Sequence, residues 1–88
     1  MLDRLKAALA LAATLNFHKA AQCLKTGQTH LSGIIKSLEQ DLGIIFFERF
    51  QHRVLLTADD ARALKEAAIL INAETMFRRN IEALHDSG

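Results

Sequence analysis

The stretch "GQTHLSGIIKSLEQDLG", residues 27–43, decides the fold, because its apolar residues recur at the spacing of one helix face. The apolar positions are Leu31, Ile34, Ile35, Leu38 and Leu42. The other face begins with short polar side chains rather than the Glu and Lys pairs of a merely solvated surface. These polar residues are Gln28, Thr29, His30, Ser32, Lys36 and Ser37. The helix therefore offers one face to a core and another to a binding partner.

Length and composition limit the possible classes of function. With 88 residues the chain forms one domain with a modest core, and it is too short to enclose a deep substrate cleft as well. No apolar run reaches the roughly 18 residues of a membrane span. The Ala-rich stretch at 7–13 is too short for a span, and the residues ahead of it do not make a signal peptide. We therefore expect a cytoplasmic protein that is not an enzyme and has no membrane partner.

Charge is spread unevenly along the chain, although the net charge is only +1. Residues 1–57 hold seven Lys/Arg against four Asp/Glu, a net charge of +3, whereas residues 58–88 hold four against six, a net charge of −2. The first part is compatible with a nucleic-acid face. The positive charge of residues 1–57 is far smaller than that of the dense basic stripe of a nonspecific DNA binder.

Two further helices are predicted ahead of residue 27. Apolar residues at 5, 8, 9 and 12 predict a helix over about residues 3–14. Asn16 is a suitable N-cap for a second helix that repeats the apolar spacing, since its side-chain oxygen can accept from free amides of the next turn. The segment "KTG" at 25–27 then forms a short turn before the third helix, which Gly43 ends. So short a turn forces the second and third helices to cross at a large angle, which is the helix-turn-helix pattern.

Beyond Gly43 the period changes from that of a helix to that of a strand. The segment "IIFFERFQHRVLLT" is rich in β-branched and aromatic residues and predicts two short strands, near 46–49 and 53–56. Val54 and Leu56 should point inward and Leu55 outward. A hairpin that follows a helix-turn-helix is a wing.

The last segment predicts one long helix, capped by Thr57 and with acidic residues in its first turn. We expect residues 1–57 to form the winged domain and residues 58–88 to form a dimerisation helix with a short tail. The apolar stripe of this helix runs past any core that the first 57 residues can build, so it needs a partner, most simply the same helix of a second chain. The stripe consists of Leu64, Ala67, Leu70, Ile71, Ala73, Phe77, Ile81 and Leu84, of which Leu70, Ala73, Phe77, Ile81 and Leu84 are assigned to the dimer interface.

Residues 16–57 resemble the N-terminal DNA-binding domain of LysR-type transcriptional regulators. That family has an aromatic residue and paired alanines before a turn, a Gln-Pro-x-x-Ser helix start, a Leu-Glu-x-x-Leu-Gly helix end, a Phe-Glu-Arg strand and a wing closing in Leu-Thr. The matching residues are Phe17, Ala20, Ala21, Leu24, Gln28, Leu31, Ser32, Ile35, Leu38, Glu39, Leu42, Gly43, Phe47, Glu48, Arg49, Arg53, Leu56 and Thr57. The resemblance implies a mainly helical winged helix-turn-helix, a homodimer and binding to an inverted-repeat operator. It also implies that the family's effector-sensing domain is absent from these 88 residues, so a small-molecule effector is expected only if such a domain exists.

The open face of the third helix is the predicted DNA contact. A recognition helix places its N-terminal residues at base edges in the major groove, where Gln bonds adenine bidentately and Ser or Thr serves either base type. Free amides near His18 would hold phosphates, and Lys36 would add a phosphate or guanine contact. On the wing, Arg53 with His52 would reach the minor groove or the backbone. The predicted DNA-binding residues are Gln28, Thr29, His30, Ser32, Lys36, His18, His52 and Arg53.

Several residues depart from the family pattern. The family usually has Pro where Thr29 stands and often has a basic residue at the position of Gly33, and its wings commonly carry more Arg. Leu15 occupies a site where a small residue or Gly often ends the first helix, and Asp60 stands where Gly is common. These changes leave the fold intact but predict fewer phosphate contacts, and hence a shallower salt dependence of DNA binding.

Other chemistry is thinly represented in the sequence. The four histidines, His18, His30, His52 and His85, lack metal-ligand spacing, and Cys23 is predicted to be a buried core thiol, so we expect no metal and no cofactor. Phe46 and Phe47 are expected in the hairpin core rather than as a stacking platform.

The alternative function is a protein-interaction module that keeps the fold but binds DNA weakly or not at all, and pairs through its C-terminal helix. Exposed Ile45, Phe50 and Leu55 would suit that role.

Overall fold

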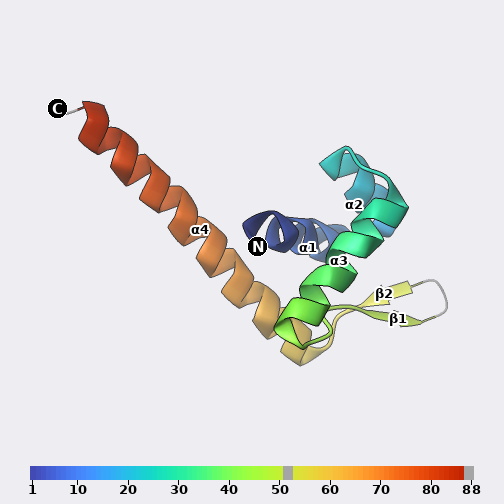
Figure 1. The fold of residues 1–88 in the computed structure, drawn as a ribbon. Coiled ribbons are helices and arrows are strands. Elements are labelled where there is room, and N and C mark those ends of the chain that lie inside the picture. Colours follow the sequence, from blue (N-terminus) through green and yellow to red (C-terminus); the bar gives the residue numbers. More distant parts are fainter. Residues whose placement is uncertain (51–52, 87–88) are drawn as a thin grey trace.

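The computed structural model describes residues 1–50 and 53–86 of the chain. Figure 1 shows three helices and a hairpin gathered into one body, from which a fourth helix projects. The elements are α1 (Leu2–Thr14), α2 (Phe17–Leu24), α3 (Gln28–Leu42), β1 (Glu48–Phe50), β2 (Arg53–Leu55) and α4 (Ala58–Asp86). The predicted winged helix-turn-helix followed by a long helix is confirmed.

The ends of α2 and α3 follow the local sequence signals. The Asn16 side-chain oxygen accepts a hydrogen bond from the Lys19 amide at 3.0 Å, as its role of N-cap requires. Gly43 ends α3 in the left-handed conformation, with φ at 69°. Lys25 ends α2 in the same region, with φ at 56°, although it carries a side chain that disfavours this backbone. The helix-turn-helix therefore includes one strained residue in its turn.

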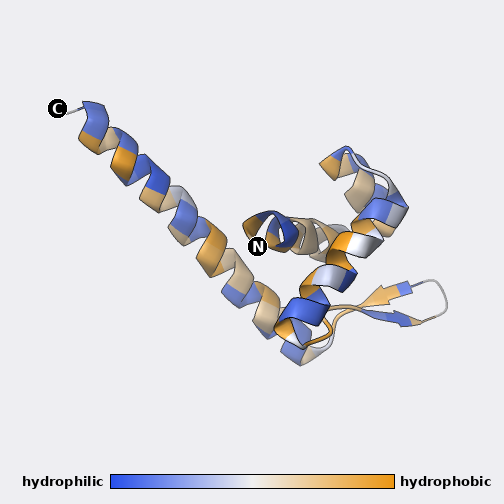
Figure 2. Ribbon diagram, viewed as in Figure 1, coloured by the Kyte–Doolittle hydropathy of each residue, from blue (hydrophilic) through white to orange (hydrophobic). Residues whose placement is uncertain are grey.

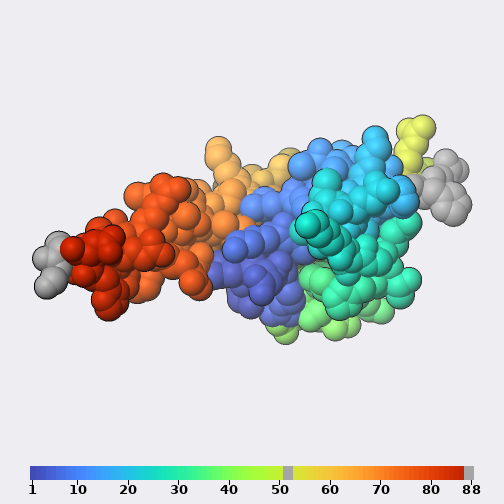
Figure 3. All heavy atoms as spheres, turned by 90° about the horizontal axis from the view of Figure 1, so that it is seen from above, coloured from blue at the N-terminus to red at the C-terminus, as the bar shows by residue number. Residues whose placement is uncertain are grey.

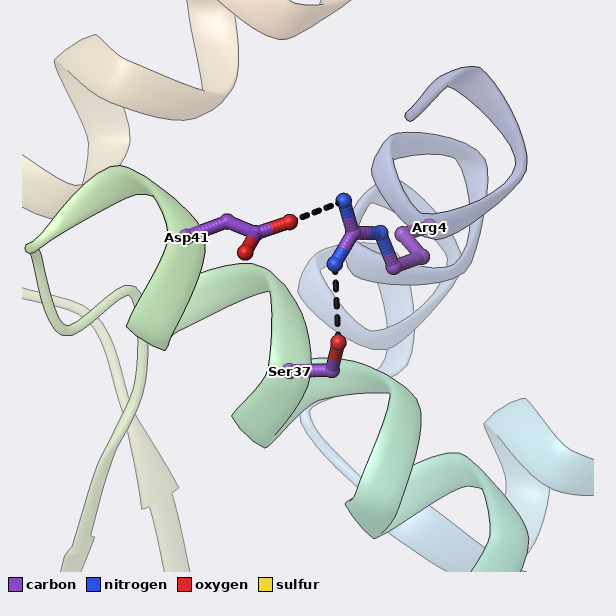
Figure 4. Close-up of polar contacts among 3 residues, drawn as sticks. All are labelled: Arg4, Ser37 and Asp41. Atoms are coloured by element: carbon purple, nitrogen blue, oxygen red, sulfur yellow. Dashed lines mark hydrogen bonds and ion pairs between the residues drawn. The ribbon is translucent and has the colours of Figure 1, made fainter.

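The core lies where α1, α2 and α3 meet. Ala20 and Ala21 are buried, and their small side chains let α2 approach its neighbours closely. The Arg4 guanidinium of α1 donates a hydrogen bond to Ser37 Oγ at 2.8 Å and pairs with Asp41, both on α3 (Figure 4). This polar bridge closes the surface edge of the contact between α1 and α3.

The wing starts later than the sequence predicted. Phe46 and Phe47 precede β1 and are buried, with 1% and 4% of their surfaces exposed. Their amides donate to the Glu39 carboxylate, at 2.8 Å and 3.4 Å, instead of joining a strand ladder. The predicted strand start at residue 46 is therefore wrong, while the predicted core position of the two rings is confirmed.

The two wing strands are antiparallel and short. Residues Glu48, Arg49 and Phe50 pair with Leu55, Val54 and Arg53 respectively. Val54 is buried and Leu55 exposed, as predicted. β2 ends at Leu55 rather than Leu56, and the Leu56 side chain is partly buried against the core.

Helix α4 begins with a reciprocal cap. The Asp60 amide donates to Thr57 Oγ1 at 3.1 Å, and the Thr57 amide donates to the Asp60 carboxylate at 2.9 Å. This is a capping-box arrangement, in which two otherwise unpaired amides at the helix start are satisfied. The cap gives the buried Asp60 side chain a hydrogen-bonding partner, which explains how Asp fits at a position where the family commonly has Gly.

Only the first part of α4 packs into the body. Leu64 and Ala67 belong to the core and Ile71 is partly buried against it, whereas hydrophobic residues continue along the projecting part (Figure 2). The molecule measures 56 × 27 × 20 Å because α4 extends beyond the body (Figure 3). All five residues assigned to the dimer stripe are exposed in the single chain: Leu70, Ala73, Phe77, Ile81 and Leu84.

Helix α4 carries an ion pair between Arg78 and Glu74, one turn apart, on the side that faces the start of α1. The hydrogen bond from Arg78 to Glu74, together with the attraction of that carboxylate, raises the pKa of the guanidinium. None of the helices in residues 1–50 and 53–86 combines the length and hydropathy of a membrane span.

Cys23 is exposed, so the prediction of a buried thiol is wrong. The apolar stripe of α2 runs through Phe17, Ala20, Ala21 and Leu24. At 100° per residue Cys23 lies about 110° around the helix from the middle of that stripe. Proximity to apolar residues in the sequence did not place the thiol on the apolar face.

The strained end of α2 generates a stability prediction. We expect Lys25→Gly to raise the free energy of unfolding by about 0.5–1 kcal/mol, because relief of the left-handed strain exceeds the added entropy of the unfolded chain. Lys19→Gly removes the same side chain from the helical part of α2 and should lower the free energy of unfolding by about 1 kcal/mol. Urea unfolding of both variants measures the difference. A loss of stability in both would contradict the assigned backbone strain.

Candidate nucleic-acid interface

The start of α2, the first turns of α3 and both wing strands surround an open hollow of about 500 Å³. Of the residues predicted to contact DNA, the structure brings five together here. They are His18, Gln28, Thr29, Ser32 and Arg53. The other lining residues are Leu15, Asn16, Phe17, Arg49 and Val54. Four elements, α2, α3, β1 and β2, thus contribute to one concave surface.

The three remaining predicted residues lie elsewhere. Lys36 is exposed one turn beyond Ser32, on the same row of α3 but outside the hollow. His30 is also exposed, and at 100° per residue it lies about 160° around α3 from Ser32. The structure therefore does not bring His30 to the hollow. His52 lies outside the described residues.

Arg49 is a member of the hollow that the sequence analysis did not assign to DNA contact. Its guanidinium carbon lies 4.4 Å from the centroid of the Phe17 ring, and its Nη1 donates to Ser32 Oγ at 3.2 Å. One side chain of β1 therefore contacts both α2 and α3. The strand register could have indicated the position of Arg49. Arg49 pairs with the inward-pointing Val54, and cross-strand partners share a face of the hairpin.

A second contact joins α2 to the first residue of α3. Gln28 Nε2 lies 3.1 Å from His18 Nδ1, within hydrogen-bonding distance. The Asn16 cap holds the turn that carries His18, and Gly27 lies immediately before Gln28. The amide of Gln28 is therefore oriented from outside its own helix.

The electrostatics of the hollow suit an anion. Arg49 and Arg53 are cationic, and no carboxylate is present among the described residues that line the hollow. Gly27 caps α3 without a side-chain acceptor, so amides of the first turn stay available at the positive end of the helix dipole. Phosphate oxygens match this surface, while the polar row of α3 suits base edges. In residues 1–50 and 53–86 no cluster of His, Cys, Asp or Glu is suited to hold a metal ion.

Comparison with known proteins identifies a matching family. The model described as bacterial regulatory helix-turn-helix protein, lysR family, matches residues 2–59. An HTH-type transcriptional regulator of Escherichia coli (strain K12), YbhD, is 39% identical over 87 residues, which are 96% of this chain and 27% of the relative. A probable nitrogen assimilation transcriptional activator of Synechococcus elongatus is 44% identical over 63 residues, 72% of this chain and 20% of the relative. The chain thus spans about a quarter of the length of these relatives.

Solved structures with the same arrangement include protein–DNA complexes. The structure of the BenM_DBD/benA site 1 DNA complex superposes with a TM-score of 0.91 at 26% identity, covering 100% of this chain and 99% of that one. The CbnR_DBD-DNA complex superposes with a TM-score of 0.81 at 30% identity, covering 96% of this chain and 98% of that one. The whole chain, including α4, therefore has counterparts in structures that hold DNA.

The Arg49 contacts generate a prediction about stability. Arg49→Ala should lower the free energy of unfolding by about 1 kcal/mol, since it removes a cation–π contact and a hydrogen bond. Arg53→Ala, on the paired strand, is the matched control and should change it by less than about 0.5 kcal/mol. Chemical denaturation of both variants, each also combined with Phe17→Leu, measures the coupling between Arg49 and Phe17. Equal losses in the two arginine variants would contradict the assigned contacts.

Proposed function

Since the chain belongs to the lysR family of bacterial regulatory helix-turn-helix proteins, we propose that it reads a specific sequence of double-stranded DNA as a homodimer. The observation that carries the proposal is the hollow in which the polar row of α3, the start of α2 and the cationic wing face the same side. The family match and the DNA complexes among similar structures favour DNA binding over an interaction module that has lost it. The site of action is the cytoplasm, where bacterial DNA lies.

Helix α3 enters the major groove in this proposal. Gln28 reads adenine through paired hydrogen bonds, while Thr29 and Ser32 serve either base type. Lys36, one turn further along, contacts a phosphate or a guanine. His30 contacts the groove wall away from the hollow.

Phosphate contacts come from the rim of the hollow. Amides at the start of α2, beside His18, hold one strand of the backbone. Arg53 reaches the backbone or the adjacent minor groove from the wing, with His52 beside it. The proposal assigns few cations to the DNA, namely Lys36 and Arg53 with Arg49 in the same hollow, so we expect a shallow salt dependence of binding.

The projecting part of α4 pairs two subunits. Its exposed apolar residues include Phe77, with 64% of its surface exposed, whereas Leu64 on the packed part is 5% exposed. A symmetric pair places two recognition helices on one side of the duplex and selects an inverted repeat whose half-sites are about one helical turn, or a multiple of it, apart. A small-molecule effector enters the proposal only through a further domain of the whole regulator.

The first experiment is selection of bound sequences from a random duplex pool, followed by affinity measurements across a salt series. We expect enrichment of an inverted repeat that binds at least ~10³-fold more tightly than random DNA. Weak binding that salt abolishes, without any enriched sequence, would overturn the proposal.

Variants of the α3 row should separate base readout from phosphate contact. Lys36→Ala and Arg53→Ala should each weaken binding to all sequences and reduce the magnitude of the salt slope by about 1, because each removes one phosphate contact. Gln28→Ala should mainly relax the preference at one base pair, at a cost of about 1–3 kcal/mol on the selected site. Titration of the selected and random duplexes measures both effects. Equal losses on the two duplexes for Gln28→Ala would refute its assignment to base readout.

A double variant tests the dimer. Phe77→Glu with Ile81→Glu should give a monomer, because it places charges in the apolar stripe of α4. Asn72→Glu with Thr75→Glu is the matched control, since it adds the same charge to the other side of α4 and should leave the dimer intact. Light scattering measures the molecular mass of each variant. An unchanged mass for Phe77→Glu with Ile81→Glu would exclude this interface.

A further inference from the structure

The contact between His18 and Gln28 connects a titratable side chain to a residue at the start of the recognition helix. Gln28 Nε2 and His18 Nδ1 are 3.1 Å apart, and both side chains line the hollow that faces DNA in the proposed function. From this geometry we infer that His18 is a positioning residue that sets which base Gln28 reads. The inference rests on the proposed function, because it concerns the base preference of the same site.

The donors and acceptor of the Gln28 side-chain amide determine which base Gln28 can read. A Gln side chain has two N–H donors and one carbonyl oxygen. In the tautomer of neutral His18 that carries its proton on the ring Nε2, Nδ1 is an acceptor, and the near atom of Gln28, its Nε2, donates one N–H to it. One N–H and Oε1 then remain, which is the pair that adenine requires at N7 and at its N6 amino group. Neutral His18 thus leaves Gln28 matched to adenine.

Protonation of His18 changes Nδ1 from a hydrogen-bond acceptor to a donor. Both ring nitrogens of a protonated imidazole are donors, so Nδ1–H needs an acceptor and the amide must turn Oε1 toward it. Gln28 then directs its N–H groups outward. Guanine presents two acceptors, O6 and N7, on its major-groove edge, whereas adenine presents one acceptor and one donor. The preference of Gln28 therefore shifts from adenine toward guanine as His18 gains a proton.

In the described part of the hollow, the polar groups around His18 are neutral or cationic. Gln28, Thr29 and Ser32 of α3 do not titrate in the range of histidine, and the wing supplies the cations Arg49 and Arg53. Lys19 follows His18 on α2, and Asn16 precedes it at the cap. No carboxylate is among the described lining residues, so among the protein side chains there Gln28 is the hydrogen-bonding partner that responds to the proton.

The test compares two duplexes that differ only at the base pair where Gln28→Ala relaxes the preference. One carries adenine and the other guanine, and the affinity ratio is measured at about pH 8 and about pH 5.5 at one salt concentration. We expect the ratio of adenine to guanine affinity to fall at least about fivefold on acidification. In His18→Phe and His18→Ala the ratio should be independent of pH, because no ring proton is left to turn the amide.

His85→Phe is the matched control, because it removes an exposed histidine at the far end of α4, away from Gln28 and from the proposed DNA contacts. It should keep the pH-dependent ratio of the unaltered chain. A ratio that stays constant with pH in the unaltered chain, or that shifts equally in the His18 variants, would overturn the inference. The proposed function would fail differently, through absence of a preferred base in every variant, including the unaltered chain.

Discussion

The short connection between α2 and α3 is the constraint on which the rest of the molecule depends. Buried Ala20 and Ala21 let α2 pack closely, and a turn of three residues joins the end of α2 to the start of α3. Lys25 adopts a left-handed backbone to make this possible. Because α2 and α3 pack closely, His18 and Gln28 meet although they lie ten positions apart in the sequence. The surface proposed to contact DNA is therefore a consequence of core packing.

The wing is held to this surface by two anchors of different chemistry. At its base, Glu39 accepts from the amides of Phe46 and Phe47, so buried aromatic rings fix where the hairpin leaves the body. Further along, Arg49 lies over Phe17 and donates to Ser32. A wing of three residues per strand is marginal by itself in water. Its position relative to α3 is set by these side chains, which lie outside the ladder.

Local signals in the sequence predicted most of the fold because they act through the backbone of single elements. Asn16, Gly43 and Thr57 mark helix ends by hydrogen bonding or by backbone freedom, and each does so in the structure. The start of β1 could not be predicted in this way, because propensity does not show that the Phe46 amide bonds to a distant carboxylate. The exposure of Cys23 is a different case, because its angle to the apolar stripe of α2 follows from the residue spacing and could have been predicted from the sequence.

Five residues of the candidate site were predictable from the sequence, but Arg49 was missed, His30 lies elsewhere, and the contacts between residues were not predictable. Gln28, Ser32 and Arg53 follow from polarity near a helix start and a wing. The contact of Arg49 with Ser32 depends on strand register and on how the wing docks, which are tertiary facts. Family resemblance marked Arg49 as a matching residue without giving it a role.

The departures from the family pattern act on charge more than on shape. Gly33 is exposed and a Cβ there would meet no atom within 4 Å, so a side chain could begin at this position without a clash. The family pattern often has a basic residue at this position, and its absence here removes a cation without changing a packing contact. In the proposed function, recognition then depends on hydrogen bonds from neutral groups such as Gln28 and Ser32, which contact His18 and Arg49 respectively. When few charged side chains contact the DNA, discrimination between bases depends more on which donor or acceptor each neutral side chain presents.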